Sequence, residues 1–279
     1  MASSSRESSA RSNKKGFPRD TVVLHQIGRG KYAPSISPFP IKLETYLRFA
    51  NIPYVSVHGT KTSSKGKIPW IEFNGEVVND TSFIIDFLNK KFNVDLNSHL
   101  SPTDRAIARA FQKMVEENLF WSLVYSRWFD KQTKFETLAP NSFIYTWVIA
   151  TYLKNGAKKN MHGHGIGRHS KEEIYHIAEK DIRALSVFLG DKCFLFGDEP
   201  CEEDCAVFGL LSQFVWQSPA TPQEALVKGD CKNLEEYCYR MKERFWPDWE
   251  QCILGDRELR SFIECPDTDP SVMKKEDKE

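Results

Sequence analysis

The sequence of 279 residues has no excess of charge of either sign. Lysine and arginine together number 38, aspartate and glutamate also number 38, and the formal net charge at pH 7 is zero. Proteins that bind nucleic acid or anionic lipid usually carry a surplus of basic residues, because attraction to phosphate groups supplies much of the affinity. The composition therefore predicts no nucleic-acid partner.

The sequence also lacks a long hydrophobic run. The most apolar stretch, FIYTWVIATYL at residues 143–153, is interrupted by two threonines and is shorter than the roughly 20 residues that span a bilayer. The first 19 residues contain serine and basic residues but no apolar stretch of a secretory signal. We expect no membrane span, a buried helix at 143–153, and disordered tails at 1–19 and 256–279.

Cysteine is scarce where redox chemistry would need it. The chain has seven cysteines, none before Cys193, and no spacing typical of a zinc ribbon or a redox pair. An odd number of cysteines without paired spacing indicates reduced thiols, so we expect a cytoplasmic protein. The N-terminal half has no thiol for mixed-disulfide chemistry, which argues against disulfide-exchange enzymes. The stretch MHGHGIGRH at 161–169 is rich in histidine, but without regularly spaced cysteine or carboxylate it indicates a mobile glycine-rich turn between domains, and we predict no metal.

What is present in the first half is an alternation of strand and helix. A β-branched run at 22–27 precedes a helical stripe at 43–50, and an alternating run at 54–58 follows. Asn74-Gly75 then lies between two extended segments, the strongest local signal for an antiparallel hairpin. Thr81 or Ser82 is expected to cap a closing helix. The order strand, helix, strand, strand, strand, helix is typical of a thioredoxin-like layer.

The second half is predicted to be helical. One long amphipathic helix is expected at 104–128, and Ser170 with Glu173 forms a capping box that opens another. A nearly uncharged helix at 206–215 belongs at the centre of a core, with Asp204 as its cap. We therefore predict an α+β protein, with a thioredoxin-like domain at 20–95 and an all-helical domain at 100–255.

Several motifs resemble a known superfamily. SPFPIKLETYL, KIPWIEFNG, DTSFIIDFL and GDEPCEEDCAVFG occur in the order of the diagnostic stretches of cytosolic glutathione transferases. Two further stretches, VEENLFWSLVYSRWF and GHGIGRHSKEEI, resemble the failed axon connections family, a metaxin-related branch. The resemblance implies a thioredoxin-like domain that holds glutathione as co-substrate and a helical transferase C-terminal domain that supplies the electrophile pocket.

The resemblance also implies roles for individual residues. Ser37 stands at the position of the catalytic serine or cysteine. Ile68, before a cis Pro69, has the backbone that pairs with the cysteinyl part of glutathione, and Thr81 with Ser82 matches the pair that receives the γ-glutamyl carboxylate. Thr81 departs from the acidic or amide residue normally found there. The implied glutathione-binding residues are Tyr32, Lys67, Ile68, Pro69, Thr81 and Ser82, and the implied structural cap is Asp204.

The chemistry assigned to Ser37 is physically reasonable. A hydroxyl donor beside the positive end of a helix stabilises a thiolate and so lowers the pKa of a bound thiol. A serine before Pro38 is, however, also an ordinary helix cap, and Tyr32 is the alternative hydroxyl. The aromatic residues at 120, 121, 125, 128 and 147 are expected either to line a substrate cleft or to form core.

The sequence therefore favours a glutathione S-transferase-like enzyme that activates the glutathione thiolate for attack on a small apolar electrophile. One alternative is a non-catalytic, metaxin-like interaction module that keeps the fold, and another is a glutathione-dependent isomerase or lyase. Transferases of this kind usually dimerise, so a homodimer is possible.

Overall fold

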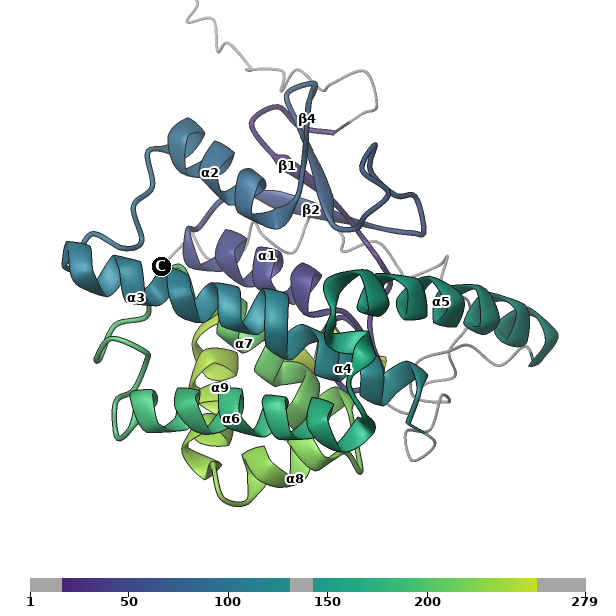
Figure 1. Cartoon of the computed structure of the whole chain (residues 1–279). Coiled ribbons are helices and arrows are strands. Elements are labelled where there is room, and N and C mark those ends of the chain that lie inside the picture. Colours follow the sequence, from purple (N-terminus) through teal and green to yellow (C-terminus); the bar gives the residue numbers. More distant parts are fainter. Residues whose placement is uncertain (1–16, 131–142, 255–279) are drawn as a thin grey trace, which may run out of the picture.

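A computed structural model describes residues 17–130 and 143–254, and Figure 1 shows their arrangement. The strands are β1 (Val22–Gln26), β2 (Tyr54–His58), β3 (Trp70–Phe73) and β4 (Glu76–Asn79). The helices before the first gap are α1 (Pro38–Phe49), α2 (Thr81–Phe92), α3 (Pro102–Lys113) and α4 (Phe120–Trp128). Those after it are α5 (Phe143–His164), α6 (Lys171–Leu189), α7 (Asp204–Ser212), α8 (Pro222–Lys228) and α9 (Lys232–Phe245).

The four strands form one mixed sheet in the order β2-β1-β3-β4. Strands β1 and β2 are parallel and joined through α1, whereas β3 is antiparallel to β1 and β4 is antiparallel to β3. The β3–β4 turn is the predicted one, since Asn74 and Gly75 both have positive φ angles of 49° and 92°. This connectivity confirms the thioredoxin-like layer.

Helices α1 and α2 cover one face of the sheet (Figure 1). Their apolar stripes, spaced at three and four residues, meet the inward side chains of β1 and β3, which alternate along each strand. The buried residues of this first core are Val22, Leu24, Leu43, Tyr46, Leu47, Ile52, Ile71, Phe73, Ile84, Ile85, Leu88 and Cys205. Because Cys205 comes from α7, the core of the sheet domain is completed by the helical domain.

The long helix predicted at 104–128 is present, but it is not uniform. Between α3 and α4 the chain makes a π-helical turn at Met114–Leu119. A second π-helical turn, Gln213–Gln217, follows α7. Single π-helical turns inside α-helices recur at functional sites, and both of these lie close to the segment that carries Ser37, as described below.

Helix α7 is the centre of the helical domain, as its nearly uncharged sequence predicts. Every residue from Asp204 to Ser212 is buried. The helix packs on the N-terminal turn of α1, and Gly209 makes this approach possible because a Cβ there would lie 2.7 Å from the Pro38 carbonyl oxygen. Farther along the same interface, Trp246 Nε1 donates to Thr45 Oγ1 at 2.9 Å. The two domains therefore share one continuous interface.

Helix α5 differs from both predictions made for its sequence. The segment 143–153 is helical but not buried at its end, since Tyr152 is 79% exposed and Leu153 is 44% exposed. The glycine-rich stretch at 161–169 is not a loop between domains, because the helix continues to His164 and a short 3-10 turn, Ile166–Arg168, leads into α6. Glycines lower helix propensity, but packing of Met161 and Ile166 against Ile174 outweighs this cost.

The described residues contain six cysteines, all of them free thiols. None of the helices in the described part of the chain is long and apolar enough to cross a membrane. The predicted tails lie almost wholly outside the described residues.

Candidate functional site

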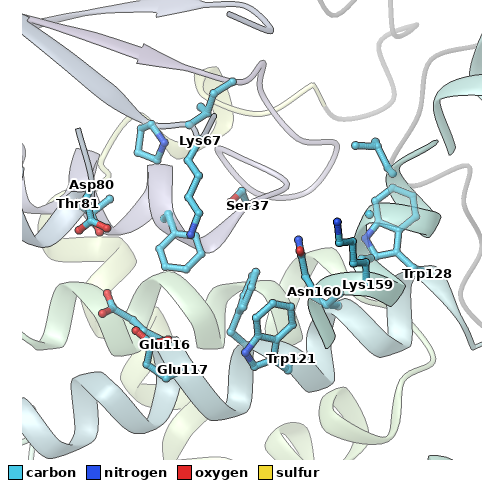
Figure 2. Close-up of a pocket in the computed structure, with 18 of the residues that line it drawn as sticks. Ser37, Lys67, Asp80, Thr81, Glu116, Glu117, Trp121, Trp128, Lys159 and Asn160 are labelled. Carbon is cyan, nitrogen blue, oxygen red and sulfur yellow. The ribbon is translucent and has the colours of Figure 1, made fainter. Parts of the chain in front are cut away.

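A cavity of about 850 Å³ lies between the sheet domain and helices α3 to α5 (Figure 2). The sheet-domain wall consists of Ser37, Phe39, Lys67, Ile68, Pro69, Asp80, Thr81 and Ser82. The opposite wall comes from the π-helical turn, α4 and α5. Six of the seven residues expected to contact glutathione thus line one cavity, although they lie as much as 45 positions apart along the sequence.

Ser37 occupies the N-cap position of α1 with an extended backbone, φ −116° and ψ 140°. A serine there normally accepts a hydrogen bond from the first turn of its helix, but the Ser37 side chain makes no such bond. The capping explanation of this residue is therefore not what the structure shows. Its half-buried hydroxyl lies in the cavity wall at the positive end of a helix of 12 residues.

The loop before Ser37 is held in place by side chains of the helical domain. Gln217 Oε1 accepts from the backbone N–H groups of Tyr32 (3.0 Å) and Ala33 (3.1 Å). Gln213 Nε2 donates to the Ser35 carbonyl at 3.2 Å. Both glutamines come from the π-helical turn after α7. The position of Ser37 therefore depends on a helix that begins more than 160 residues later in the chain.

Arg127 completes this set of contacts. Its guanidinium donates to the Ile36 carbonyl, to Gln213 Oε1 at 2.6 Å and, more weakly, to Ser218 Oγ at 3.4 Å. These acceptors are neutral, Arg127 Nε has no hydrogen-bond partner, and no carboxylate pairs with Arg127 among the described residues. Burial lowers the pKa of Arg127 below its usual range. An uncompensated positive charge thus lies directly behind the peptide that precedes Ser37.

The Ile68–Pro69 peptide bond is cis, as predicted. Ile68 and Pro69 line the cavity just before β3, and Lys67 precedes them. No hydrogen bond or ion pair of the Lys67 ammonium group occurs among the described residues, whereas its backbone N–H donates to Ser63 Oγ. The ammonium group is therefore available to an anionic ligand.

The start of α2 differs from the prediction by one residue. The N-cap is Asp80, with φ 75° and ψ 127°, and its carboxylate accepts from the Ser82 N–H at 3.1 Å. Neither Thr81 nor Ser82 caps the helix, because both already lie within its first turn. Asp80 also lines the cavity, so an acidic side chain is present next to Thr81, which has none. The sequence signal for this role was the acidic residue directly before Thr81.

A buried ion pair beneath the cavity was not anticipated. Lys42 of α1 places its Nζ 2.5 Å from Glu116 Oε1 and 3.3 Å from Thr81 Oγ1. Glu116 belongs to the π-helical turn between α3 and α4. The pair therefore joins three elements around the start of α2, a convergence that no sequence spacing reveals.

The opposite wall is largely aromatic. Phe120, Trp121 and Trp128 line the cavity, and Phe39 packs edge-on against Phe120 with ring centroids 5.1 Å apart. Tyr125 instead packs against the cluster of Met161, Ile166 and Ile174. The side chain of Trp147 lies outside the described residues. The aromatic stripe is thus divided between cleft and core.

Two further predicted residues lie away from the cavity wall. Tyr32 belongs to the loop held by Gln217 and is not among the lining residues. Asp204 is fully buried, and its carboxylate accepts from the N–H groups of Cys201 (2.8 Å) and Leu195 (3.3 Å) and from the Tyr237 hydroxyl (2.9 Å). The prediction that Asp204 is the helix cap is wrong, because Glu203 is the N-cap of α7 and Asp204, its first residue, instead binds the backbone of the turn before the helix. Burial raises the pKa of Asp204, although these hydrogen bonds oppose the shift.

The histidine-rich stretch does not form a metal centre in the described part of the chain, where no group of three or more metal-ligating side chains converges. His164 instead packs against Trp121, with ring centroids 5.1 Å apart. His169 lies 3.3 Å from Glu173 at the start of α6.

Comparison with known families gives matches in both domains. The family model described as the glutathione S-transferase N-terminal domain matches residues 38–133. The model described as the glutathione S-transferase C-terminal domain matches residues 178–241.

Curated relatives extend these matches. The failed axon connections protein of Drosophila melanogaster is 34% identical over 91% of this chain, which spans 65% of that protein's length. An isoprene-epoxide–glutathione S-transferase of a Rhodococcus species is 32% identical over 76% of this chain and 94% of its own. Metaxin-2 of Mus musculus is 23% identical over 84% of this chain and 91% of its own.

Solved structures agree on the fold. A beta-etherase of a Sphingobium species superposes with a TM-score of 0.59 at 14% identity, covering 81% of this chain and 99% of its own. A glutathione S-transferase of Methylobacterium radiotolerans, crystallised with glutathione sulfonate, gives a TM-score of 0.55 at 16% identity. The match covers 80% of this chain and 91% of the transferase chain. At this level of identity the likeness concerns the fold alone.

Proposed function

Because the chain belongs to the glutathione S-transferase superfamily, we propose that it binds glutathione in the cavity beside Ser37 and activates its thiol for attack on a small apolar electrophile. The observation that carries this proposal is that the Ser37 hydroxyl is not used as a helix cap and lines the same cavity as the start of α2 and the cis Ile68–Pro69 peptide.

The charges at this end of the cavity match the groups of glutathione. The Ser82 hydroxyl and the positive end of the α2 dipole suit the γ-glutamyl carboxylate, since the Ser82 N–H is already bonded to Asp80. Both Asp80 and Lys67 line the cavity, and in the proposed complex Asp80 accepts from the ammonium group and Lys67 pairs with the second carboxylate. The backbone of Ile68 is left to hydrogen-bond the cysteinyl part. These assignments leave the thiol directed towards Ser37.

The proposed chemistry needs no base and no change of oxidation state. The Ser37 hydroxyl donates a hydrogen bond to the thiolate, and the thiol proton passes to solvent. The sulfur then attacks an electrophilic carbon. For an epoxide, the class named in the Rhodococcus relative, the S–C bond forms as the C–O bond breaks, and the alkoxide takes a proton from water. The aromatic wall of Phe120, Trp121 and Trp128 receives the apolar body of the electrophile.

Replacement of Ser37 by alanine tests the proposal. A hydrogen bond to a charged group is worth about 1.5 to 3 kcal/mol, so Ser37→Ala should raise the pKa of bound glutathione by about one to two units and lower turnover at neutral pH. The measurements are calorimetric binding of glutathione, thiolate absorbance against pH, and conjugation of a general aryl halide. Tyr32→Phe is the matched control and should leave the pKa unchanged. The reverse pattern would move the role of thiol activation from Ser37 to Tyr32.

The rival function is a non-catalytic interaction module with the same fold, prompted by the similarity to failed axon connections and metaxin-2. It predicts neither calorimetric binding of glutathione nor conjugation by the wild-type chain. Because the chain spans only 65% of the Drosophila protein's length, the activity and partners of that whole protein are themselves only proposals for this chain. We propose that the protein is cytoplasmic, a compartment that suits the free thiols of its described residues.

A further inference from the structure

The ionisable side chains that line the cavity divide into paired and unpaired groups. Glu116 is paired with Lys42 at 2.5 Å, and Glu117 with Lys113 at 3.1 Å. The two charges of each pair neutralise each other, so the pairs leave little net charge for a ligand. The remaining charged lining residues are Asp80, Lys67 and Lys159. The first two are assigned above to glutathione, and the third is left over.

Lys159 lies at the other end of the cavity. Figure 2 shows Ser37 between Asp80 and Thr81 on one side and Lys159, Asn160 and Trp128 on the other. Among the described residues, the Lys159 ammonium group forms no hydrogen bond or ion pair. Helix α5, which carries Lys159, contains no acidic residue along its whole length. Within residues 17–130 and 143–254, nothing neutralises the positive charge at this end of the cavity.

Large apolar side chains line the cavity, together with the polar Asn155 and Asn160 of α5. Trp121, Val124 and Trp128 line it from α4, and Leu153 lines it from α5. A second substrate that reacts beside Ser37 would lie along these side chains before it met the ammonium group. Apolar contact would hold its body, and charge attraction would select its far end.

We propose that the second substrate is amphipathic, with an electrophilic carbon on an apolar body that ends in an anionic group such as a carboxylate, and that Lys159 binds this group. The inference rests on the proposed function and extends it by naming the substrate class. It assigns a specificity role to α5 that the resemblance to known families did not suggest.

A matched pair of aryl enones tests the inference. One carries a para carboxylate and the other its methyl ester, and each enzymatic rate is divided by the uncatalysed rate with glutathione because the ester makes its enone intrinsically more electrophilic. In both, the thiolate sulfur bonds to the β-carbon, the π electrons form an enolate, and the enolate takes a proton from water. We expect wild-type kcat/KM to favour the acid by up to about fivefold at low salt, the upper end for one exposed ion pair of about 1 kcal/mol. The preference should fall as salt is raised.

Two neighbouring lysine variants separate a specific contact from a general effect of charge. Lys159→Gln should raise KM for the acid and leave KM for the ester unchanged. Lys158→Gln is the control, because Lys158 is also an exposed lysine of α5 but does not line this cavity. It should keep the preference for the acid. Equal conversion of acid and ester by wild type, or an equal effect of both variants, overturns the inference.

A binding measurement distinguishes failure of this inference from failure of the proposed function. Saturated analogues of the acid and ester cannot react, and their binding is followed through tryptophan fluorescence, since Trp121 and Trp128 line the cavity. Tighter binding of the acid that is lost in Lys159→Gln supports the anionic subsite even without turnover. Conjugation of both enones at equal rates rejects the subsite but leaves the transferase function standing.

Discussion

Arg127 carries a buried charge behind the proposed thiol site that no carboxylate compensates among the described residues. Its guanidinium holds the Ile36 carbonyl and the Gln213 side chain, and its charge acts on the segment that ends at Ser37. A buried cation is costly without an anionic partner, because desolvation is not repaid. A thiolate at Ser37 would supply the missing negative charge. We therefore regard Arg127 as a positioning residue that favours the thiolate form of the ligand.

Removal of the charge of Arg127 should be visible in the titration of bound glutathione. Arg127→Met is expected to raise the pKa of the bound thiol by about one unit, equivalent to about 1.4 kcal/mol, and to lower kcat more than it raises KM. Arg127→Lys keeps the charge but loses the forked contact, so it should recover much of the pKa shift. The measurement is thiolate absorbance against pH.

A purely structural role for Arg127 predicts a different pattern. Both variants would then weaken glutathione binding alike, without moving the pKa of the thiol. Ser82→Ala is a useful comparison, because Ser82 lines the same cavity from the first turn of α2 and not from the segment that Arg127 holds. Ser82→Ala should weaken the affinity for glutathione and leave the pKa of the bound thiol unchanged.

At the scale of elements, the contact between α1 and α7 sets the geometry of the site. Ser37 stands at the start of α1, and α7 lies against that same turn through Gly209. Close packing of two helices requires small side chains where the backbones approach each other. The site therefore depends on a glycine that does not line it.

Gly209→Ala should damage both stability and binding. The added Cβ would meet the Pro38 carbonyl at 2.7 Å and the Lys42 backbone nitrogen at 3.1 Å, so one helix must shift. Overpacking of this kind costs about 1 to 3 kcal/mol. We expect denaturant unfolding to show that loss, together with weaker glutathione binding because Ser37 moves with α1.

Gly163→Ala is the matched control for this prediction. Gly163 is also helical, but an added Cβ there would meet nothing within 4 Å. Alanine is the better helix former, so this variant should be neutral or slightly stabilising, by up to about 1 kcal/mol. Equal effects of the two substitutions would contradict the assigned role of Gly209.

At the scale of the whole molecule, a buried network around Glu44 ties the fold together. Arg29 donates to both carboxylate oxygens of Glu44, at 2.8 and 3.1 Å, and Gln26 and Tyr54 add bonds at 2.9 and 3.1 Å. Arg48, 3.6 Å from the same carboxylate, continues the network to Asp248 at the far end of the helical domain. The network thus joins four parts of the chain, which are β1, β2, α1 and the segment after α9.

This network should make the protein sensitive to acid. Burial alone would raise the pKa of Glu44, but the paired arginines and hydrogen bonds lower it to about 2. Between that value and the ordinary pKa of about 4.3, the unfolded state binds more protons than the folded state. The stabilisation is therefore complete above about pH 5 and is lost progressively as pH falls from there towards 2. Urea unfolding at several pH values measures this slope.

Glu44→Gln should flatten that slope and destabilise the protein at neutral pH by about 3 to 5 kcal/mol, because it leaves Arg29 buried without its anionic partner. Glu76→Gln is the control, since the Glu76–Lys91 pair at 2.7 Å is largely exposed. Such surface pairs contribute about 1 kcal/mol or less. A wild-type slope retained in Glu44→Gln would assign the acid sensitivity to other carboxylates.

The sequence by itself determined the order and type of most elements, because hydrophobic spacing, turn residues and capping boxes are local signals. The hairpin at Asn74-Gly75 and the capping box of Ser170 with Glu173 follow from such patterns, whereas the cis Pro69 was implied by the resemblance to the family. The motifs also placed Ser37 at the start of α1, because their order along the chain is itself a sequence property.

Only the tertiary structure decided how these elements form a site. Arg127, Gln213 and Gln217 hold the Ser37 segment across more than 80 residues of intervening chain, and no spacing rule connects positions so far apart. The exposed end of α5 was likewise mispredicted, since an apolar run does not reveal whether neighbouring elements cover it. Local energies select the elements, whereas contacts between distant segments select which side chains face the cavity.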